Sequence, residues 1–482
     1  MFNPAFLPDN GGSRTVFGAA TATEVAELRK AMETGYGTDV ATLTGAGALR
    51  IQSLEKTMLA TVQENKHFTL GNILPATEAT ATVDEWTEQS GVGGFLGSSV
   101  SGEAGVIPTA QGTYARHVGT VKYLKTRREI TYAAVLQNGL VAAEAIEAQN
   151  GAVQLLTDRE ALCFYGDSSV VPEEFDGIYK QVSDLGLSDH VIDAGGNSLA
   201  SVNSIVDAAA TVSRRGNFGT PTHLFLNPMV GADMDKNFDP AMRVALPGGM
   251  LAQRGTPLRG IVTAQGDVEV VRNVFIGDEA DRQPFQVENS ALAVTNDSFK
   301  PQAITPTAGA GGADSLWGAS HAGNYYYAVA GRNKNGQSTI LVSSQVAVAA
   351  GQQVSIAITA SVAATESGYA IYRGRKNGTN AVTDLRLMVS VPVTAGGTTT
   401  YIDKNRDLPG TSKAFLLNLL PGANAITWRQ YLPMSKFQLY ATTSDVVPWA
   451  QLLFGYLRLG KRRQHVVIKN IVTSNAAWKP FA

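Results

Sequence analysis

Residues 135–167, VLQNGLVAAEAIEAQNGAVQLLTDREALCFYGD, decide the fold of this chain. Apolar side chains recur every three to five positions from Leu136 to Phe164, which places them on one stripe of a helix. Polar residues fill much of the remainder, and FYGD at 164–167 ends the pattern before a turn that closes in EFDGI at 174–178. At 1.5 Å per residue, roughly 28 residues span about 40 Å. The stretch therefore predicts a long spine helix.

Residues 66–135, before the spine helix, form an excursion from the body. Alternating side chains at 79–86 and 114–132 predict two extended strands. Between them lie SGVGGFLG at 90–97 and a further polar, Gly-bearing stretch to 112. A tip with so few large side chains has little to bury on itself, so we expect a hairpin that leaves its own core. Phe95 and Leu96 then become anchors on a neighbouring molecule; a surface loop with incidental apolar residues is the alternative.

This order of features resembles the major capsid proteins of tailed bacteriophages, which have the HK97-like fold. The features are a Gly-rich excursion, a basic extended strand, a long helix and the pattern FYGD…P…FDGI, and the resemblance covers residues 1 to about 300 and about 413 to 482. It implies a structural protein with no catalytic residue, cofactor or metal ion. Pentamers and hexamers of such a protein form an icosahedral head shell around double-stranded DNA.

The resemblance also implies partners and a location. The subunit contacts copies of itself, and portal, scaffold or decoration proteins are expected beside it. Contact with packaged DNA is non-specific, and no membrane is involved. The protein assembles in the cytoplasm of the bacterial host and resides in the capsid of the virion.

The remaining sequence predicts an α+β body around the spine helix. Residues 1–65 form an N-terminal arm with short helices at 23–32 and 48–65, which in the family reaches across adjacent subunits. Residues 136–300 hold the spine helix and a mixed peripheral and axial body, and residues 413–482 return to it. The predicted elements are helices at 198–215, 229–238 and 448–459 and strands at 222–228, 268–275, 414–420 and 465–472.

Residues 301–412 predict an inserted all-β module. A Pro, Thr, Gly and Ala-rich stretch at 300–314 has the composition of a linker. The run YYYAV…NGQS…SGYAIYRG then gives strands every 10 to 15 residues with Gly-bearing turns. It resembles a fibronectin type III or immunoglobulin-like sandwich, inserted in the body and displayed on an exterior surface. Its tyrosines, which are Tyr325, Tyr326, Tyr327, Tyr369 and Tyr372, are expected mostly in its core, with a glycan platform as the alternative.

Composition excludes several classes of function. The 482 residues carry 39 Lys and Arg against 41 Asp and Glu. A dedicated nucleic-acid binder needs a basic excess to displace counterions. The single cysteine, Cys163, excludes an intrachain disulfide and is expected as a small core residue. No apolar run reaches about 18 residues, so no membrane span is expected.

Positive charge concentrates in two places, Lys122, Lys125, Arg127 and Arg128 in the basic strand and residues 461–463. These side chains either face DNA inside a shell or pair with a neighbouring subunit. Because the first run alternates with apolar residues that need a partner surface, the sequence favours intersubunit pairing.

Motifs for catalysis are incomplete. Residues 455–461 match Gly-x-x-x-x-Gly-Lys, but Arg462 replaces the Ser or Thr of a phosphate-binding loop, and a helix is expected before it instead of a strand. The six histidines lack metal-ligand spacing. Asp278, Glu279 and Asp281 are expected as a solvated turn, with cation binding or pairing with an adjoining subunit as the alternatives.

Two alternatives to a phage capsid remain at this point. An encapsulin-like compartment shares the fold but encloses a cargo enzyme. A carbohydrate-acting enzyme or lectin with a fibronectin-type module belongs to another class, and the sequence offers no convincing pair of catalytic carboxylates for it.

Overall fold

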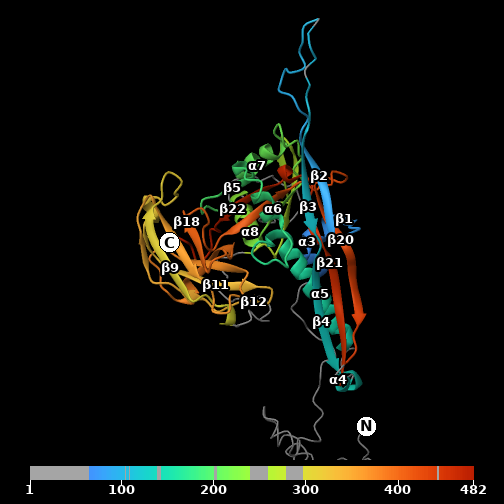
Figure 1. Cartoon of the computed structure of the whole chain (residues 1–482), viewed down its shortest axis with the longest axis vertical. Helices are drawn as coiled ribbons and strands as arrows, with labels where there is room; N and C mark the ends of the chain where they lie inside the picture. Colours follow the sequence, from blue (N-terminus) through green and yellow to red (C-terminus); the bar gives the residue numbers. More distant parts are fainter. Residues whose placement is uncertain are drawn as a thin grey trace, which may run out of the picture. The chain divides into compact units, whose positions relative to one another are not determined.

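The computed structural model describes residues 64–481 except 104, 108, 138–142, 200–202, 239–258, 278–296 and 442–444 (Figure 1). The predicted arm, residues 1–65, lies almost wholly outside these ranges, and so do Asp278, Glu279 and Asp281. The described residues begin with the short 3-10 helix η3, Asn65–His67, and the short α-helix α3, Thr69–Ile73. No described helix is both long and apolar enough to cross a membrane.

The spine helix is present and ends where its sequence predicts. α4 Tyr132–Gln137 precedes the undescribed residues 138–142, and α5 Ala143–Tyr165 follows them. At the end of α5 the Gly166 N–H donates to Leu162 O at 2.9 Å, and a Cβ on Gly166 would lie 2.2 Å from Phe175 O. Only glycine fits there, which explains the abrupt stop in FYGD.

A four-stranded sheet lies beside α5 (Figure 1). Its order is β1-β20-β21-β4, with β1 Ala76–Glu78, β20 Ile426–Gln438, β21 Val446–Leu459 and β4 Lys122–Thr131. The predicted helix at 448–459 is therefore wrong. This segment pairs with β4 on one side and β20 on the other, and the pairing outweighs its local preference for a helix. Every second side chain, at Trp449, Gln451 and Leu453, is buried on the face towards α5.

A buried carboxylate fastens the segment before this sheet to the spine helix. Glu160 on α5 is fully buried and accepts the N–H groups of Leu70 and Gly71 at 2.8 and 2.9 Å. Its Oε1 also accepts Asn273 Nδ2 at 2.8 Å. Burial raises the pKa of Glu160, although the three hydrogen bonds act in the opposite direction. One side chain thus joins α5, α3 and the end of strand β8, Gly266–Arg272.

The predicted excursion is a hairpin of β2 Val83–Gly91 and β3 Thr113–Thr120, paired from Val83↔Thr120 to Gly91↔Thr113. The sequence predicted one strand over 114–132, but the structure breaks it at Val121. This residue is buried, and its N–H donates to Thr82 O at 2.9 Å. The chain therefore leaves the hairpin and enters β4 in a different sheet.

A six-stranded sheet completes the body, in the order β5-β22-β19-β6-β8-β7. Alternate residues of its central strands face opposite cores. Phe225 and Phe415 pack against Phe164 of α5 in tilted contacts, at 6.0 and 5.0 Å between ring centroids. Leu224 and Leu416 belong to the other core, which includes residues of α7. The elements are β5 Val191–Asp193, β22 Val466–Ile471, β19 Ser412–Leu417, β6 His223–Leu226, β8 Gly266–Arg272, β7 Gly260–Thr263, α6 Ile178–Ser183, α7 Asn203–Ser213, α8 Pro228–Phe238, η4 Ser188–His190 and η8 Arg462–Gln464.

Residues 303–403 form the sandwich, in which a three-stranded sheet faces a five-stranded one across a shared core. The first sheet is β18-β15-β9, with β18 Thr398–Asp403, β15 Gln352–Thr359 and β9 Ala303–Ala310. The linker predicted at 300–314 is therefore wrong. Its Thr and Ala residues form edge strand β9, which pairs with β15 from Ala303↔Thr359 to Ala310↔Gln352.

The second sheet supplies the aromatic part of the core. Tyr325, Tyr327 and Tyr369 are fully buried, which confirms that most of the tyrosines are core residues. The sheet order is β12-β11-β16-β17, and β13 also pairs with β11. The remaining elements are β10 Gly323–Tyr325, β11 Tyr327–Asn333, β12 Gly336–Gln337, β13 Leu341–Val342, β14 Val346–Val348, β16 Gly368–Gly374, β17 Leu385–Pro392, η5 Asp297–Phe299, η6 Ala319–His321 and η7 Val382–Asp384.

Candidate intersubunit interface

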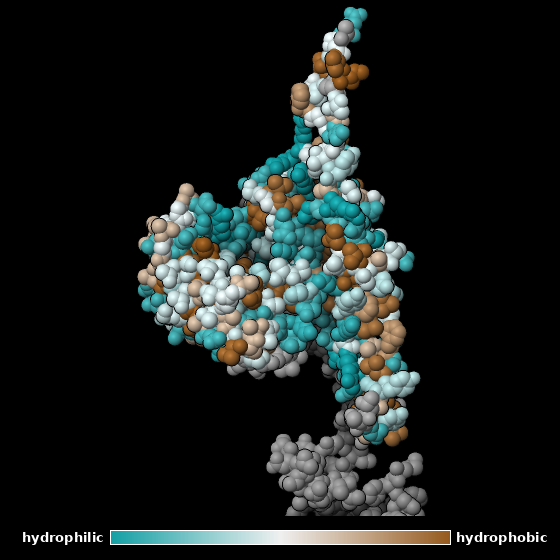
Figure 2. Space-filling view, viewed as in Figure 1, coloured by the Kyte–Doolittle hydropathy of each residue, from teal (hydrophilic) through white to brown (hydrophobic). Residues whose placement is uncertain are grey.

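The loop between β2 and β3, residues 91–112, exposes apolar side chains. Phe95 and Leu96 are 79% and 81% exposed, and Val92, Val100, Val106 and Ile107 are exposed as well. Figure 1 draws the loop as a continuation of the hairpin, and Figure 2 shows apolar surface on it. Burying a side chain such as Phe or Leu is worth about 1.5–3 kcal/mol. An apolar loop without a buried residue among those described is suited to docking on another surface.

The base of the hairpin is held by a charged cluster. Asp84 on β2 accepts Arg429 Nε at 2.7 Å and the Tyr456 hydroxyl at 2.5 Å, and Arg458 lies 3.7 Å away. Burial opposes ionisation of Asp84, but the hydrogen bonds from Tyr456 and Arg429 and the arginine charges outweigh it. The pKa of Asp84 is therefore lowered. The hairpin begins from an ionised, fixed anchor.

Aromatic and charged groups extend this anchor along β2 and β3. His117 Nε2 lies 3.1 Å from Glu88 Oε2, and Arg462 NH2 lies 3.2 Å from the same ring nitrogen. The Arg458 guanidinium lies over the Trp86 ring at 5.8 Å. These contacts join the hairpin to β21 and η8, so the loop is presented from a rigid base.

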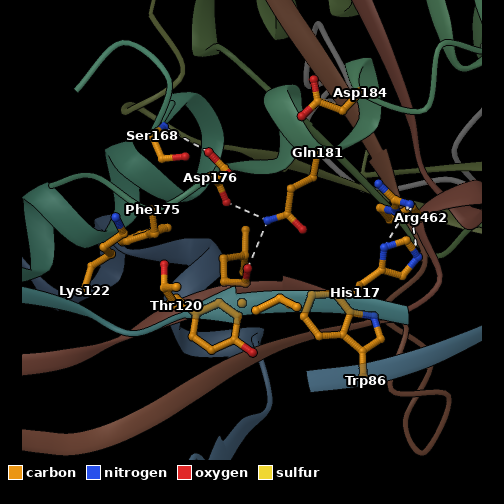
Figure 3. Close-up of a pocket in the computed structure, with 14 residues that line it drawn as sticks. Trp86, His117, Thr120, Lys122, Ser168, Phe175, Asp176, Gln181, Asp184 and Arg462 are labelled. Atoms are coloured by element: carbon orange, nitrogen blue, oxygen red, sulfur yellow. Dashed lines mark hydrogen bonds between the residues drawn. The ribbon is translucent and has the colours of Figure 1, made fainter. Parts of the chain in front are cut away.

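A cavity of about 170 Å³ lies where the hairpin base meets the turn after α5 (Figure 3). Its polar groups bind one another: Ser168 N donates to Asp176 Oδ1 at 2.9 Å, and Gln181 Nε2 donates to Asp176 O at 2.6 Å. Gln181 also reaches Leu457 O at 2.9 Å. These contacts make the cavity a structural crevice and give it no reacting pair.

The structure divides the predicted basic run between two sheet faces. Arg128 faces α5, where it contacts Glu147 at 3.4 Å and Gln154 at 2.7 Å. Lys122 Nζ donates to Pro172 O. These two side chains therefore have partners within the chain.

Lys125 and Arg127 lie on the opposite face, which we call the outer sheet face. Lys125 Nζ lies over the rings of Tyr123 and Phe454 at 5.4 and 5.6 Å, and Arg127 donates to Glu129 at 2.8 Å. The partly or fully exposed members of this face include Tyr123, Lys125, Arg127, Glu129, Ala450, Leu452, Phe454 and Phe437. Sequence reasoning found the basic residues but missed the apolar ones on β20 and β21. Residues 449–454 alternate between buried and partly exposed side chains, as a strand does, although their sequence predicts a helix.

The Gly-x-x-x-x-Gly-Lys segment and Cys163 are structural parts of the fold. Gly455 lies within strand β21, and the three-residue turn η8 follows Lys461, so no phosphate-binding loop forms. Cys163 is buried, and burial raises the pKa of its thiol well above the usual value. Among the residues that the structure describes, no group of three His, Cys, Asp or Glu is placed to hold a metal ion.

Known proteins similar to this chain include major capsid proteins of phages. The major capsid protein of Staphylococcus phage S25-3 is 25% identical over 462 residues, which cover 92% of this chain and 95% of that protein. A putative major capsid protein of Enterococcus phage phiEF24C is 25% identical over 461 residues, covering 92% and 94%. The capsid of a native GTA particle gives a TM-score of 0.45 at 10% identity, over 90% of this chain and 100% of that one. No family model matches the chain.

The mixed α+β body with its spine helix, together with the similarity to phage major capsid proteins over nearly the whole length, defines a structural protein of a capsid. The chain is a major capsid protein, which forms the head shell of a tailed phage and resides in the virion.

Proposed function

We propose that copies of this chain assemble as pentamers and hexamers, with the loop at 91–112 of each copy docked on a neighbouring copy. The exposure of Phe95 and Leu96 on a rigidly based hairpin is the observation that carries this proposal. A loop of this composition gains free energy only when another surface covers it. Many such modest contacts, repeated around a closed shell, give high collective stability.

The outer sheet face is the surface on which we place a neighbouring contact. It combines apolar side chains with Lys125, which lies over the Tyr123 and Phe454 rings, and with Arg127, which donates to the exposed Glu129 on the same face. Arg128 and Lys122 lie on the other face of the sheet, where they contact Gln154 and Pro172 O. The described part of the loop carries one charged residue, Glu103, which is exposed. Opposite charge at an apolar contact favours correct orientation more than affinity. In the proposed contact, Lys125 and Arg127 of one copy lie near the loop of the neighbouring copy, which carries Phe95 and Leu96.

The sandwich is, in this proposal, an immunoglobulin-like or fibronectin III-like module inserted in the capsid body over about residues 301–412. Its strands lie between β8 and β19 in the sequence, and both of these belong to the six-stranded sheet of the body. Two facing β-sheets with a buried Trp317 and buried tyrosines support that class.

The shell encloses double-stranded DNA, which the subunit contacts without sequence preference. A net charge of −2 is compatible with that role, because a tight DNA binder would carry a basic excess. Portal, scaffold or decoration proteins complete the expected set of partners. The phage relatives favour a head shell over an encapsulin-like compartment.

Electron microscopy of the protein expressed alone, with sizing by light scattering, tests the proposal. Wild-type protein is expected to form closed shells or rings of five and six. A variant without residues 90–112 is expected to keep a folded subunit, because the described residues between the hairpin strands contribute no buried side chain, and to form no shells. Intact particles from this deletion would refute the bridging role of the loop.

A further inference from the structure

The chain ends in a short segment, residues 474–481, that crosses from the capsid body to the sandwich. Its first residue is fixed to α8: Ser474 N and Oγ donate to the two carboxylate oxygens of Asp233 at 2.5 and 2.6 Å. Asp233 is 1% exposed. Burial opposes its ionisation, but the Ser474 hydrogen bonds prevail and lower its pKa. The segment therefore starts from a buried, charged anchor in the body.

Trp478 occupies a built site on the sandwich. The indole is 4% exposed, and its Nε1–H donates to Asp384 O at 3.0 Å. The Arg386 guanidinium covers one face of the ring at 5.2 Å. Gly410 lies against it so closely that a Cβ there would fall 2.5 Å from Trp478 Cζ3. A backbone acceptor, a cation and a glycine wall together recognise an indole.

Two further contacts bind the end of the segment. Lys376 N–H donates to Pro480 O at 2.9 Å, so a sandwich amide is satisfied by the terminal segment. The ring of Phe481 stacks on His321 with 4.1 Å between centroids. Backbone and side chains of the segment thus both engage the sandwich.

Other elements of the body contact the same module. A Cβ on Gly368 would lie 2.5 Å from the buried Val170, in the turn after α5. In the segment that connects β18 of the sandwich to β19 of the body, Leu408 N donates to Asn470 Oδ1 at 3.0 Å, Asn470 Nδ2 donates to Arg406 O at 2.7 Å, and Asp407 pairs with Lys469 at 2.9 Å. The body therefore contacts both the sandwich and the segment that leaves it.

From these contacts we propose that residues 474–481 form a strap, anchored on Asp233, whose Trp478 docks in a site on the sandwich formed by Asp384, Arg386 and Gly410. The strap fastens the sandwich to the capsid body, so the module is a fixed part of each subunit and not a tethered appendage. This inference goes beyond shell formation and does not rest on it, because every contact lies within one chain.

Hydrogen exchange on the full-length, unassembled subunit tests the strap. The amide of Lys376 reports directly on docking, because its acceptor is Pro480 O. In Trp478→Ala we expect this amide to exchange at least about tenfold faster, as local opening requires less free energy once the indole is removed. A synthetic peptide of residues 473–482 added to Trp478→Ala is expected to restore protection, and the same peptide carrying Ala at 478 is not.

Lys479→Ala is the matched control, since Lys479 lies in the same segment but its Nζ donates to Ser474 O, within the segment itself, at 3.0 Å. Exchange at Lys376 in this variant should equal that of the wild type. Unchanged protection of Lys376 in Trp478→Ala would overturn the proposal, and so would failure of the wild-type peptide to restore it. Because the measurement is made on single subunits, its outcome is independent of whether shells form.

Discussion

At the scale of single residues, His465 gives the chain a defined pH response. It is fully buried between Asn418 N, which donates to Nδ1 at 3.3 Å, and Ala425 O, which lies 3.4 Å from Nε2. Burial lowers its pKa to about 4, although the hydrogen bond to Ala425 opposes this. The neutral imidazole is therefore part of the folded state.

This shift predicts loss of stability in acid. The unfolded chain binds a proton at His465 near pH 6.5 and the folded chain only near pH 4. The stabilisation is thus fully present above pH 6.5 and is lost as the pH falls to 4, by about 3 kcal/mol. Urea unfolding of the subunit between pH 7 and 4 measures it. His465→Asn should show a shallower pH dependence by that amount, and an equal dependence in both proteins would contradict the assignment.

Phe218 carries backbone strain at an exposed position. Its φ is +50° and its side chain is 74% exposed. The turn is locked by Gln464, whose Nε2 donates to the carbonyls of Asn217 and Phe218 at 3.1 and 3.3 Å. A left-handed backbone disfavours any residue with a Cβ.

Phe218→Gly is therefore expected to stabilise the subunit by about 0.5–1 kcal/mol, the relief of strain less the added freedom of the unfolded chain. Chemical denaturation measures the change. Phe218→Ala is the control, because it removes the ring but keeps the Cβ, and no comparable gain is expected from it. Equal stabilisation by both substitutions would show that removing the exposed ring is responsible and not the backbone.

At the scale of elements, Gly119 decides how closely β3 crosses β21. A Cβ on Gly119 would lie 2.3 Å from Tyr456 Cε2, and the hydroxyl of this tyrosine binds Asp84. Gly119→Ala is expected to displace Tyr456 and to destabilise the subunit by about 1–3 kcal/mol. Hydrogen exchange along β2 and β3 should increase with it.

Gly102→Ala is the matched control for this change. Gly102 lies in the exposed loop, and a Cβ there meets nothing within 4 Å. Its stability should match that of the wild type. If Gly119→Ala behaved in the same way, the hairpin base would not be the rigid support that we describe.

The sequence predicted elements well where a local signal and the tertiary structure agree. Gly166 ends α5 as FYGD indicates, and the turn predicted at Asn335-Gly336 is formed by Lys334 and Asn335, with Gly336, at φ +119°, as the first residue of β12. Prediction from the sequence failed where pairing between strands distant in the sequence determines the structure. β21 is apolar enough to mimic a helix but lies between β4 and β20, and β9 has the composition of a linker but pairs with β15.

At the scale of the whole molecule, the capsid class could be predicted from the order of features along the chain. The contact residues could be predicted only in part. Phe95 and Leu96 could be predicted because a Gly-rich tip cannot bury them. The different partners of Arg127 and Arg128 could not, because they depend on which face of the sheet packs against α5. The strap could not be predicted, because nothing local in residues 474–481 shows that Trp478 meets Asp384.

The measurement that tests shell formation through the loop most directly compares two double variants by sedimentation velocity and negative-stain microscopy. Phe95→Ser with Leu96→Ser removes the proposed anchors. Val362→Ser with Val382→Ser removes two exposed apolar side chains of the sandwich instead. We predict folded but unassembled subunits from the first variant and wild-type shells from the second. Shells from the first variant as abundant as those of the wild type would contradict the docking role of the loop.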